Sequence, residues 1–143
     1  MTVSHILKTK GNAVVTASLS DTIETIVKTL AAKRIGAIVV LDGEKIAGIV
    51  SERDVVRAFA EHGSAALALA ASKVMTAKVF TCGLADSEAE LMSMMTTKRI
   101  RHLPVVNAGR LAGMISIGDV VKNRMEAMER EAEDMKSYIA SAG

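Results

Sequence analysis

The chain contains almost no aromatic residues. Phe59, Phe80 and Tyr138 are the only three among 143 residues, and tryptophan is absent. Half of the residues are nonetheless apolar, so a hydrophobic core has to be built from Ile, Val, Leu, Ala and Met. The single cysteine, Cys82, excludes an intramolecular disulfide and fits a reducing compartment. No apolar run approaches the roughly 20 residues needed to span a bilayer, and the N-terminal residues lack the apolar stretch of a signal peptide. We therefore expect a cytoplasmic protein that makes no membrane contact.

Several functional classes have no support in the sequence. The formal net charge is only +2, with acidic and basic residues interspersed, whereas nucleic-acid binding usually needs a clustered basic stripe. The three histidines, His5, His62 and His102, have no metal-ligand spacing, and neither a CxxC nor an HExxH motif is present. No nucleophile with a matching base can be identified, and Cys82 is interpreted as a small buried residue. We expect neither a metal site nor an enzyme, and nucleic acid is not an expected partner.

One sequence pattern occurs twice in the chain. Residues 48–56 read GIVSERDVV and residues 113–121 read GMISIGDVV, an offset of 65 that aligns residues 15–57 with a second copy without a gap. The chain is therefore a tandem duplication, and we place the first repeat at residues 1–72 and the second at residues 73–143. A unit of about 65 residues is close to the lower limit for independent folding, so we expect the two repeats to pack together.

Each repeat predicts the order strand, helix, strand, strand, helix. In the first copy, Asp21 is the expected N-cap of a helix with Glu24 as its capping-box partner, and Gly36 marks the helix end. The later elements are strands over residues 37–41 and 45–50, joined by a hairpin turn at Asp42 and Gly43, and a helix that Ser51 opens.

The second copy predicts the same elements 65 residues later. They are a strand over residues 79–81, a helix over 86–98, strands over 102–106 and up to 115 with a turn at 107–109, and a final helix. Between the repeats, residues 64–75 are rich in alanine and contain no proline, so we expect a short helix and a connector rather than a flexible linker.

The final helix is expected to extend well beyond its counterpart in the first repeat. Its apolar residues are spaced 4, 3, 4, 3, 4, which is the a/d seam of a coiled coil; they are Val121, Met125, Met128, Ala132, Met135 and Ile139. One interpretation is that the helix packs back along its own repeat. The other, which we favour, is that the stripe contacts a second chain and makes the protein a homodimer.

These repeats, each carrying G-h-h-S-x-x-D and joined by a connector that ends in Val74 and Met75, resemble a tandem pair of CBS domains, the Bateman module. The resemblance spans residues 3–124 and is strongest in KRIGAIVV and GIVSERD of the first repeat and in KRIRHLPVV and GMISIGD of the second. It implies an α+β fold in which two β-α-β-β-α repeats pack through their sheets with pseudo-two-fold symmetry, followed by an extended C-terminal helix. Small stand-alone bacterial members of the family are the most similar in organisation.

The resemblance also implies two clefts between the repeats that bind adenosine-containing ligands, such as AMP, ATP, NAD(H) or S-adenosylmethionine. In the family, the Asp of the motif holds the ribose hydroxyls, the Ser lies near ribose or phosphate, and a Thr at the first strand lines the pocket. Carried over, these residues are Thr16, Ser51 and Asp54 in the first repeat and Thr81, Ser116 and Asp119 in the second.

The chemistry of the motif fits a binding role, but it also fits a purely structural one. A Ser that caps a helix leaves backbone N–H groups that attract anions, and an Asp in the first turn can accept hydrogen bonds from two vicinal hydroxyls. The alternative is that Ser51 with Asp54, and Ser116 with Asp119, only cap their helices. The short Asp at both equivalent positions favours ligand binding.

The two repeats differ where phosphates would bind. Arg101 and His102 stand in the second repeat where the first has Gly36 and Ala37. Arg101 fits the basic residue with which the family often holds phosphate, and Arg53 inside the first motif is a further candidate. We therefore count Ala37, Arg53, Arg101 and His102, together with the six motif residues, as candidate ligand-binding residues, and we expect the two clefts to be unequal.

The leading hypothesis is a nucleotide-sensing regulatory module, in which a bound ligand shifts the arrangement of repeats or subunits and an unidentified protein partner responds. The nucleotide is then a ligand, and no catalytic cofactor is expected. A dimeric protein-interaction module with vestigial clefts is the first alternative, and a nucleic-acid binder is the second.

Overall fold

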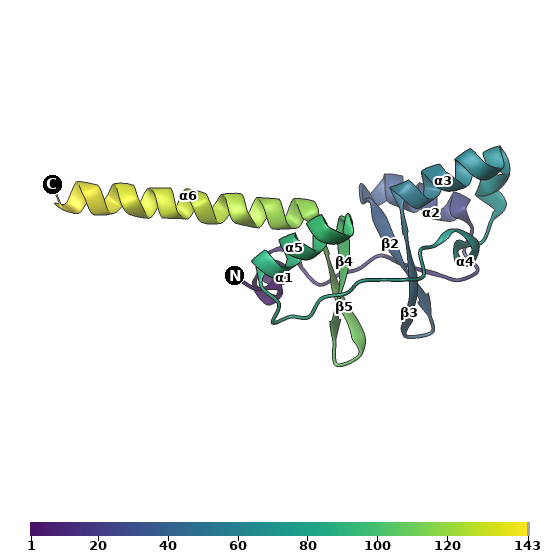
Figure 1. Cartoon of the computed structure of the whole chain (residues 1–143), viewed down its shortest axis with the longest axis horizontal. Helices are drawn as coiled ribbons and strands as arrows, with labels where there is room; N and C mark the ends of the chain where they lie inside the picture. The colour runs from purple at the N-terminus through teal and green to yellow at the C-terminus, as the bar shows by residue number, and fades with distance from the viewer. Residues whose placement is uncertain (143) are drawn as a thin grey trace.

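The computed structural model describes residues 1–142 and shows a mixed α+β chain with two small sheets and a long C-terminal helix (Figure 1). Its elements are α1 (Val3–Lys10), β1 (Thr16–Ser18), α2 (Ile23–Lys33), β2 (Ala37–Asp42), β3 (Lys45–Ser51), α3 (Glu52–His62), a 3-10 helix η1 (Gly63–Ala68), α4 (Ala71–Val74), α5 (Glu88–Lys98), β4 (His102–Asn107), β5 (Arg110–Ser116) and α6 (Ile117–Ala142). The predicted duplication is visible as two similar halves, and the fold class is confirmed.

The first repeat forms a three-stranded sheet in the order β1-β2-β3. The central strand β2 pairs in parallel with β1 and antiparallel with β3. Its first four residues, 37–40, are all buried, as expected for a strand covered on both faces. The predicted hairpin is present, but its turn residues are Gly43 and Glu44, because Asp42 still pairs with Lys45.

Helix α2 begins one residue later than predicted and α5 two residues later. Thr22 and Ser87 are their N-caps, so the assignment of Asp21 as a cap is wrong, and Asp86 lies before α5 instead of inside it. The Asp21 carboxylate instead accepts hydrogen bonds from the backbone N–H and the hydroxyl of Ser18, both at 2.9 Å. The two aspartates thus close the turns that lead into the helices.

The end of α2 also differs from the prediction. Arg34, in the left-handed conformation with φ 54°, is the C-cap, and the Ile35 N–H donates back to the Leu30 carbonyl at 3.1 Å. Gly36 therefore does not end the helix. A Cβ at Gly36 would lie 3.2 Å from the imidazole ring of His102, so the glycine makes room for a side chain of the other repeat.

The second repeat lacks the strand predicted at residues 79–81. Its sheet contains β4 and β5, and the counterpart of β1 is one parallel bridge between Cys82 and Val105. The Cys82 N–H donates to the carbonyl of Pro104 at 3.0 Å. Pro104 occupies the position of Val39 and has no N–H to donate on that side of its strand, so the pairing cannot extend toward residue 79.

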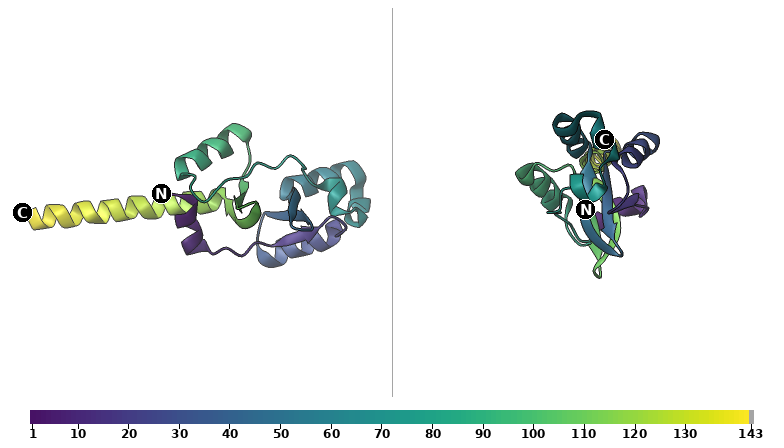
Figure 2. Two further views of the ribbon diagram at one scale, coloured as in Figure 1. Left: turned by 90° about the horizontal axis from the view of Figure 1, so that it is seen from below. Right: turned by 90° about the vertical axis from the view of Figure 1, so that its right-hand side faces the viewer.

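The two repeats exchange their opening helices, as Figures 1 and 2 show. Helix α1 begins the first repeat but buries Val3, Ile6 and Leu7 in the hydrophobic cluster of the second. Helix α4, the counterpart of α1, spans the predicted boundary between the repeats and packs Ala71 and Val74 against the cluster of the first. The sheets also meet, because β3 contacts β5. This exchange joins two small cores into one folded unit.

Helix α6 leaves the body of the molecule after its first two turns and projects from it (Figures 1 and 2). Its buried residues are Val120 and Asn123. The apolar residues of the predicted seam from Met125 onward are exposed, with 57% of Met125 and 64% of Ile139 accessible. The interpretation that this helix packs back along its own repeat is therefore wrong. Within residues 1–142, no helix has the length and apolar character required to cross a membrane.

Candidate ligand-binding site

A cavity of about 410 Å³ lies between the two repeats, within the range of small-molecule sites. Three segments line it: the junction of β3 and α3, the connector residues 76–80, and the residues 98–102 that lead into β4. The first belongs to the first repeat and the other two lead into the second. Because the opening helices are exchanged, the connector crosses the N-terminal end of α3. This crossing creates the inter-repeat cleft, which we call the first cleft.

The motif of the first repeat forms the floor of the first cleft. Ser51 caps α3, and its hydroxyl accepts from the Asp54 N–H at 3.4 Å, while the Asp54 carboxylate accepts from the Ser51 N–H at 2.9 Å. The other carboxylate oxygen, Oδ1, accepts from the Thr76 hydroxyl at 2.8 Å and from Arg57 at 3.3 Å. Asp54 is only 4% exposed. The helix-capping geometry that a purely structural role of the motif predicts is thus present. In addition, the Thr76 hydroxyl of the connector contacts the Asp54 carboxylate.

Cationic side chains surround this floor. The cavity is lined by Arg53, Arg57, Lys78, Lys98, Arg99 and Arg101. Glu52 and Asp54 are the two carboxylates among its lining residues, which gives the lining a net charge of +4 with His102 neutral. The whole chain carries only +2. The positive charge of the protein is therefore concentrated at this cleft, where it creates a local field for anions.

An aromatic residue positions two of these cations. The ammonium groups of Lys78 and Lys98 lie 5.7 and 5.2 Å from the centre of the Phe80 ring. Phe80, Val79 and Ile100 supply apolar surface inside the same cavity. The first cleft consequently combines an apolar wall, a carboxylate and a cationic rim, which are the parts that a base, a sugar and phosphates require.

His102 lies at the boundary between the repeats. Its ring packs against Gly36 and lines the first cleft. Burial lowers the pKa of His102 below its ordinary value of 6.5, and the nearby Lys10 adds to this effect, whereas the carboxylates of Glu52 and Asp119 oppose it. His102 is therefore neutral at pH 7 and offers a hydrogen-bonding nitrogen rather than a positive charge.

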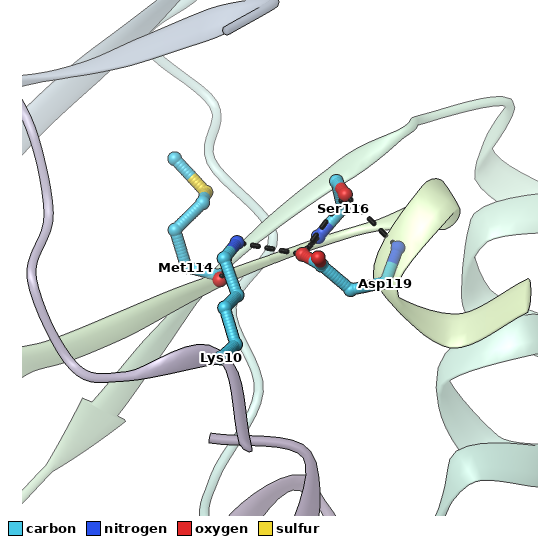
Figure 3. A network of polar contacts seen from close by, with 4 residues as sticks. All are labelled: Lys10, Met114, Ser116 and Asp119. Atoms are coloured by element: carbon cyan, nitrogen blue, oxygen red, sulfur yellow. Dashed lines mark hydrogen bonds and ion pairs between the residues drawn. The ribbon is translucent and has the colours of Figure 1, made fainter. Parts of the chain in front are cut away.

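The motif of the second repeat has the same local geometry but a different third partner (Figure 3). The Asp119 carboxylate accepts from the N–H and the hydroxyl of Ser116 at 2.8 and 2.9 Å. The ammonium of Lys10 lies 2.6 Å from Asp119 Oδ2 and donates to the Met114 carbonyl at 2.6 Å. Burial alone would raise the pKa of Asp119, but the hydrogen bonds from Lys10 and Ser116 outweigh it and hold the pKa below its ordinary value of 3.8.

The structure brings together half of the predicted ligand-binding residues. Ser51, Arg53, Asp54, Arg101 and His102 line the first cleft. The other five lie elsewhere: Ala37 is buried opposite Ser51 on β2, Thr16 is exposed on β1 near the hairpin tips, Thr81 is exposed on the connector, and Ser116 and Asp119 form the second motif. Thr16 and Thr81 do not line the first cleft, and their proposed role has no geometric support there.

Sequence reasoning missed several lining residues. Arg57 follows Asp54 by three positions and therefore shares its face of α3, a spacing that could have identified it. Thr76 and Lys78 reach the cleft through the crossing of the connector, and no local pattern marks them. Lys98 and Arg99 begin the KRIRHLPVV stretch, which could have identified them.

Other chemistry is not supported by the part of the chain that the structure describes. Residues 1–142 contain no group of three His, Cys, Asp or Glu side chains that could hold a metal ion. Burial, with a smaller contribution from Asp86, raises the pKa of the Cys82 thiol to about 11. A thiol of this pKa is protonated at neutral pH and is a poor nucleophile.

Comparisons with known proteins agree with this geometry. The model of the CBS domain matches residues 3–61 and 71–126. The mitochondrial CBS domain-containing protein CBSX3 of Arabidopsis thaliana is 31% identical over 96% of this chain and 71% of its own length. Among solved structures, a CBS-domain containing protein of Agrobacterium tumefaciens is 45% identical with a TM-score of 0.85, covering 87% of this chain and 99% of that one. A CBS domain protein of Pyrobaculum aerophilum complexed with AMP is 28% identical with a TM-score of 0.74, over 83% and 89% of the two chains.

The two matched segments correspond to the two halves of the duplication, and together they cover most of the chain. The small stand-alone organisation expected from the sequence is also that of the Agrobacterium protein, nearly all of which is covered. The protein therefore belongs to the CBS-domain family and carries a tandem pair of its domains.

Proposed function

We propose that this protein is a regulatory module that senses an adenine nucleotide in the first cleft. One observation carries the proposal: the inter-repeat cavity combines the Ser51–Asp54 motif with a cationic rim. The AMP complex of the Pyrobaculum relative supports an adenosine ligand for this fold. We expect the cleft to act by binding, because a positive rim and a capped carboxylate are the groups that hold phosphate and ribose.

Each part of the nucleotide has a counterpart in the first cleft. A ribose hydroxyl takes the place of the Thr76 hydroxyl at Asp54 Oδ1, which exchanges one neutral donor for another. The base lies against the apolar wall that includes Val79 and Ile100. The phosphates lie toward the arginines, among which Arg53 and Arg101 can make bidentate contacts.

The charge of the first cleft favours a ligand with several phosphates. A net lining charge of +4 exceeds what the single phosphate group of AMP neutralises. We therefore expect ATP, whose triphosphate carries more negative charge than AMP or NAD(H), to bind most tightly, with an affinity difference that shrinks as salt screens the rim.

Isothermal titration of AMP, ATP, NAD and NADH tests this function. We expect one nucleotide to bind the wild type at micromolar affinity or better, about −8 kcal/mol. Asp54→Ala should weaken binding about 10- to 100-fold, since a charge-assisted hydrogen bond contributes about 1.5–3 kcal/mol. Arg101→Ala should weaken ATP binding more than adenosine binding, because the arginine contacts only phosphate.

Circular dichroism of each variant provides the folding control, because Asp54 is buried and hydrogen-bonded. A folded Arg101→Ala protein that binds ATP like the wild type contradicts the assignment of the rim. If no adenosine compound binds the wild type, the clefts are vestigial and the motifs are helix caps. The interaction-module alternative then replaces the sensor.

We further propose that the protein is a homodimer joined by the exposed seam of α6. The seam residues from Met125 to Ile139 have no partner within residues 1–142 that would bury them. The flanking charges complement one another in a parallel pair of helices: Arg124 lies opposite the partner's Glu129, and Glu131 lies opposite the partner's Lys136. A second copy of this helix therefore fits the seam both in apolar spacing and in charge. The regulated protein partner then responds to a dimer and not to a single chain.

A further inference from the structure

The N-terminal helix places a cation in the second motif. Lys10 is the last residue of α1, and the burial of Val3, Ile6 and Leu7 in the second-repeat cluster fixes where this helix ends. From there the Lys10 side chain reaches the Asp119 carboxylate and the Met114 carbonyl, each at 2.6 Å (Figure 3). Two short contacts hold the ammonium at one position, although a third of the side chain remains accessible to solvent.

In the first repeat, the lysine that corresponds to Lys10 does not pair with the motif aspartate. The backbone bonds from Val3 to Asp86 and from Ala71 to Asp21 relate the opening helices by an offset of 68, so Lys10 corresponds to Lys78, whose ammonium lies over the Phe80 ring. Asp54 Oδ1 instead accepts from the Thr76 hydroxyl at 2.8 Å and from Arg57 at 3.3 Å, and its Oδ2 accepts from Ser51. Asp119 Oδ2 meets the Lys10 ammonium at 2.6 Å, a shorter charged contact than that of Arg57, so the second aspartate is harder to free.

We propose that Lys10 is an internal ligand of the second motif, Ser116 and Asp119, where it competes with the ribose of an adenosine ligand for Asp119. This inference rests on the proposed function, since it assumes that the motif aspartates hold ribose. Lys10 occupies Oδ2 of Asp119 and the neighbouring Met114 carbonyl, so the two vicinal hydroxyls of a ribose cannot both bond to this carboxylate until the ammonium leaves. The first cleft then fills first, and binding at the second motif requires a movement of the Lys10 side chain.

The substitution is Lys10→Met, because methionine has a similar length and no charge. The probe is adenosine, which has the ribose but no phosphate, so the loss of a positive charge does not itself weaken attraction for the ligand. Side-chain methyl NMR resolves the two sites: Met114, whose carbonyl accepts from Lys10, reports the second motif, and the equivalent Ile49, which lines the first cleft, reports the first. Lys8→Met is the control, since Lys8 is an exposed lysine on the same helix.

We expect adenosine affinity at Met114 to rise about three- to tenfold in Lys10→Met, the range for removing a partly exposed ion pair that a ligand must break. Affinity at Ile49 should stay at its wild-type value, and Lys8→Met should match the wild type at both methyls. An unchanged or weaker response of Met114 in Lys10→Met overturns the inference, and weaker binding would make Lys10 a ligand contact. ATP titration at Ile49 separates the two proposals: if Ile49 responds while Met114 gains nothing, only the internal ligand is wrong. If neither methyl responds in any variant, the sensing function fails and the internal ligand fails with it.

Discussion

Gly48 and Gly113 open the two motifs. The connector packs against Gly48 and α1 packs against Gly113, which leaves no room for a side chain at either position. A Cβ at Gly48 would lie 2.6 Å from the Met75 sulfur and 2.8 Å from the backbone oxygen of Thr76. That oxygen is held by the Ile49 N–H at 3.0 Å and cannot move away freely. We expect Gly48→Ala to lower the free energy of unfolding by about 1–3 kcal/mol, the usual cost of overpacking, as measured by urea denaturation.

Two other glycines give graded controls for this prediction. A Cβ at Gly113 would meet only the end of the Leu7 side chain, at 2.9 Å, so Gly113→Ala should cost less than Gly48→Ala. At Gly118, in the first turn of α6, the nearest atom is 3.6 Å away, and alanine should cause no loss of stability. Equal losses of stability in Gly48→Ala and Gly118→Ala would show that the connector does not pack tightly against Gly48.

The local chemistry of the motif could be predicted from the sequence, whereas its surroundings could not. Ser51 as a cap with Asp54 in the first turn follows from spacing alone, and the structure contains that capping box. The contact between Lys10 and Asp119 joins residues 109 positions apart and depends on where α1 packs. Periodicity predicts which face of a helix is buried, but not which repeat buries it.

The duplication made most of the secondary structure predictable, because each copy checked the other. It also led to an error, since a strand in one copy does not guarantee a strand in the other. A single Pro104 in place of Val39 removes one backbone donor and reduces the counterpart of β1 in the second repeat to a bridge. The predicted start of α2 is wrong for a similar local reason. The Asp21 carboxylate accepts from Ser18, so Thr22 and not Asp21 caps the helix.

The charges that flank the α6 seam give a test of its partner. In a parallel pair, Glu131→Lys replaces an attraction by a repulsion at both symmetric positions, because the introduced ammonium faces the partner's Lys136. We expect the dimer to weaken by about 1–2 kcal/mol, or roughly five- to thirtyfold in Kd, measured by sedimentation equilibrium. The double exchange Glu131→Lys with Lys136→Glu should restore the wild-type Kd.

Glu133→Lys is the matched control, because it makes the same change in net charge at a position away from the seam. A seam dimer loses affinity only with Glu131→Lys. Equal Kd values for the two single variants would mean that this face of α6 does not contact a second chain in parallel register.

The molecule divides into a body that contains both repeats and a helix that projects from it (Figure 2). The match to the CBS domain ends at residue 126, close to where α6 leaves the body. The first cleft is lined by residues between 36 and 102, and Val120 and Asn123 are the residues that anchor α6. The proposed binding site and the proposed dimer contact thus lie in different parts of the chain, which makes the two proposals separable by experiment.

Ending the chain after Glu126 should therefore remove dimerisation while nucleotide binding in the first cleft remains. Because a dimer is stabilised by mass action, the Tm of the full chain should rise with protein concentration, whereas the Tm of the shortened chain should not. Titration of ATP should give the same affinity for both, since the first cleft retains all of its lining residues. A shortened protein that still sediments as a dimer would place the subunit interface on the body. A shortened, folded protein that loses ATP would instead show that the nucleotide site is completed only when two chains associate, and sensing and assembly would then be one event.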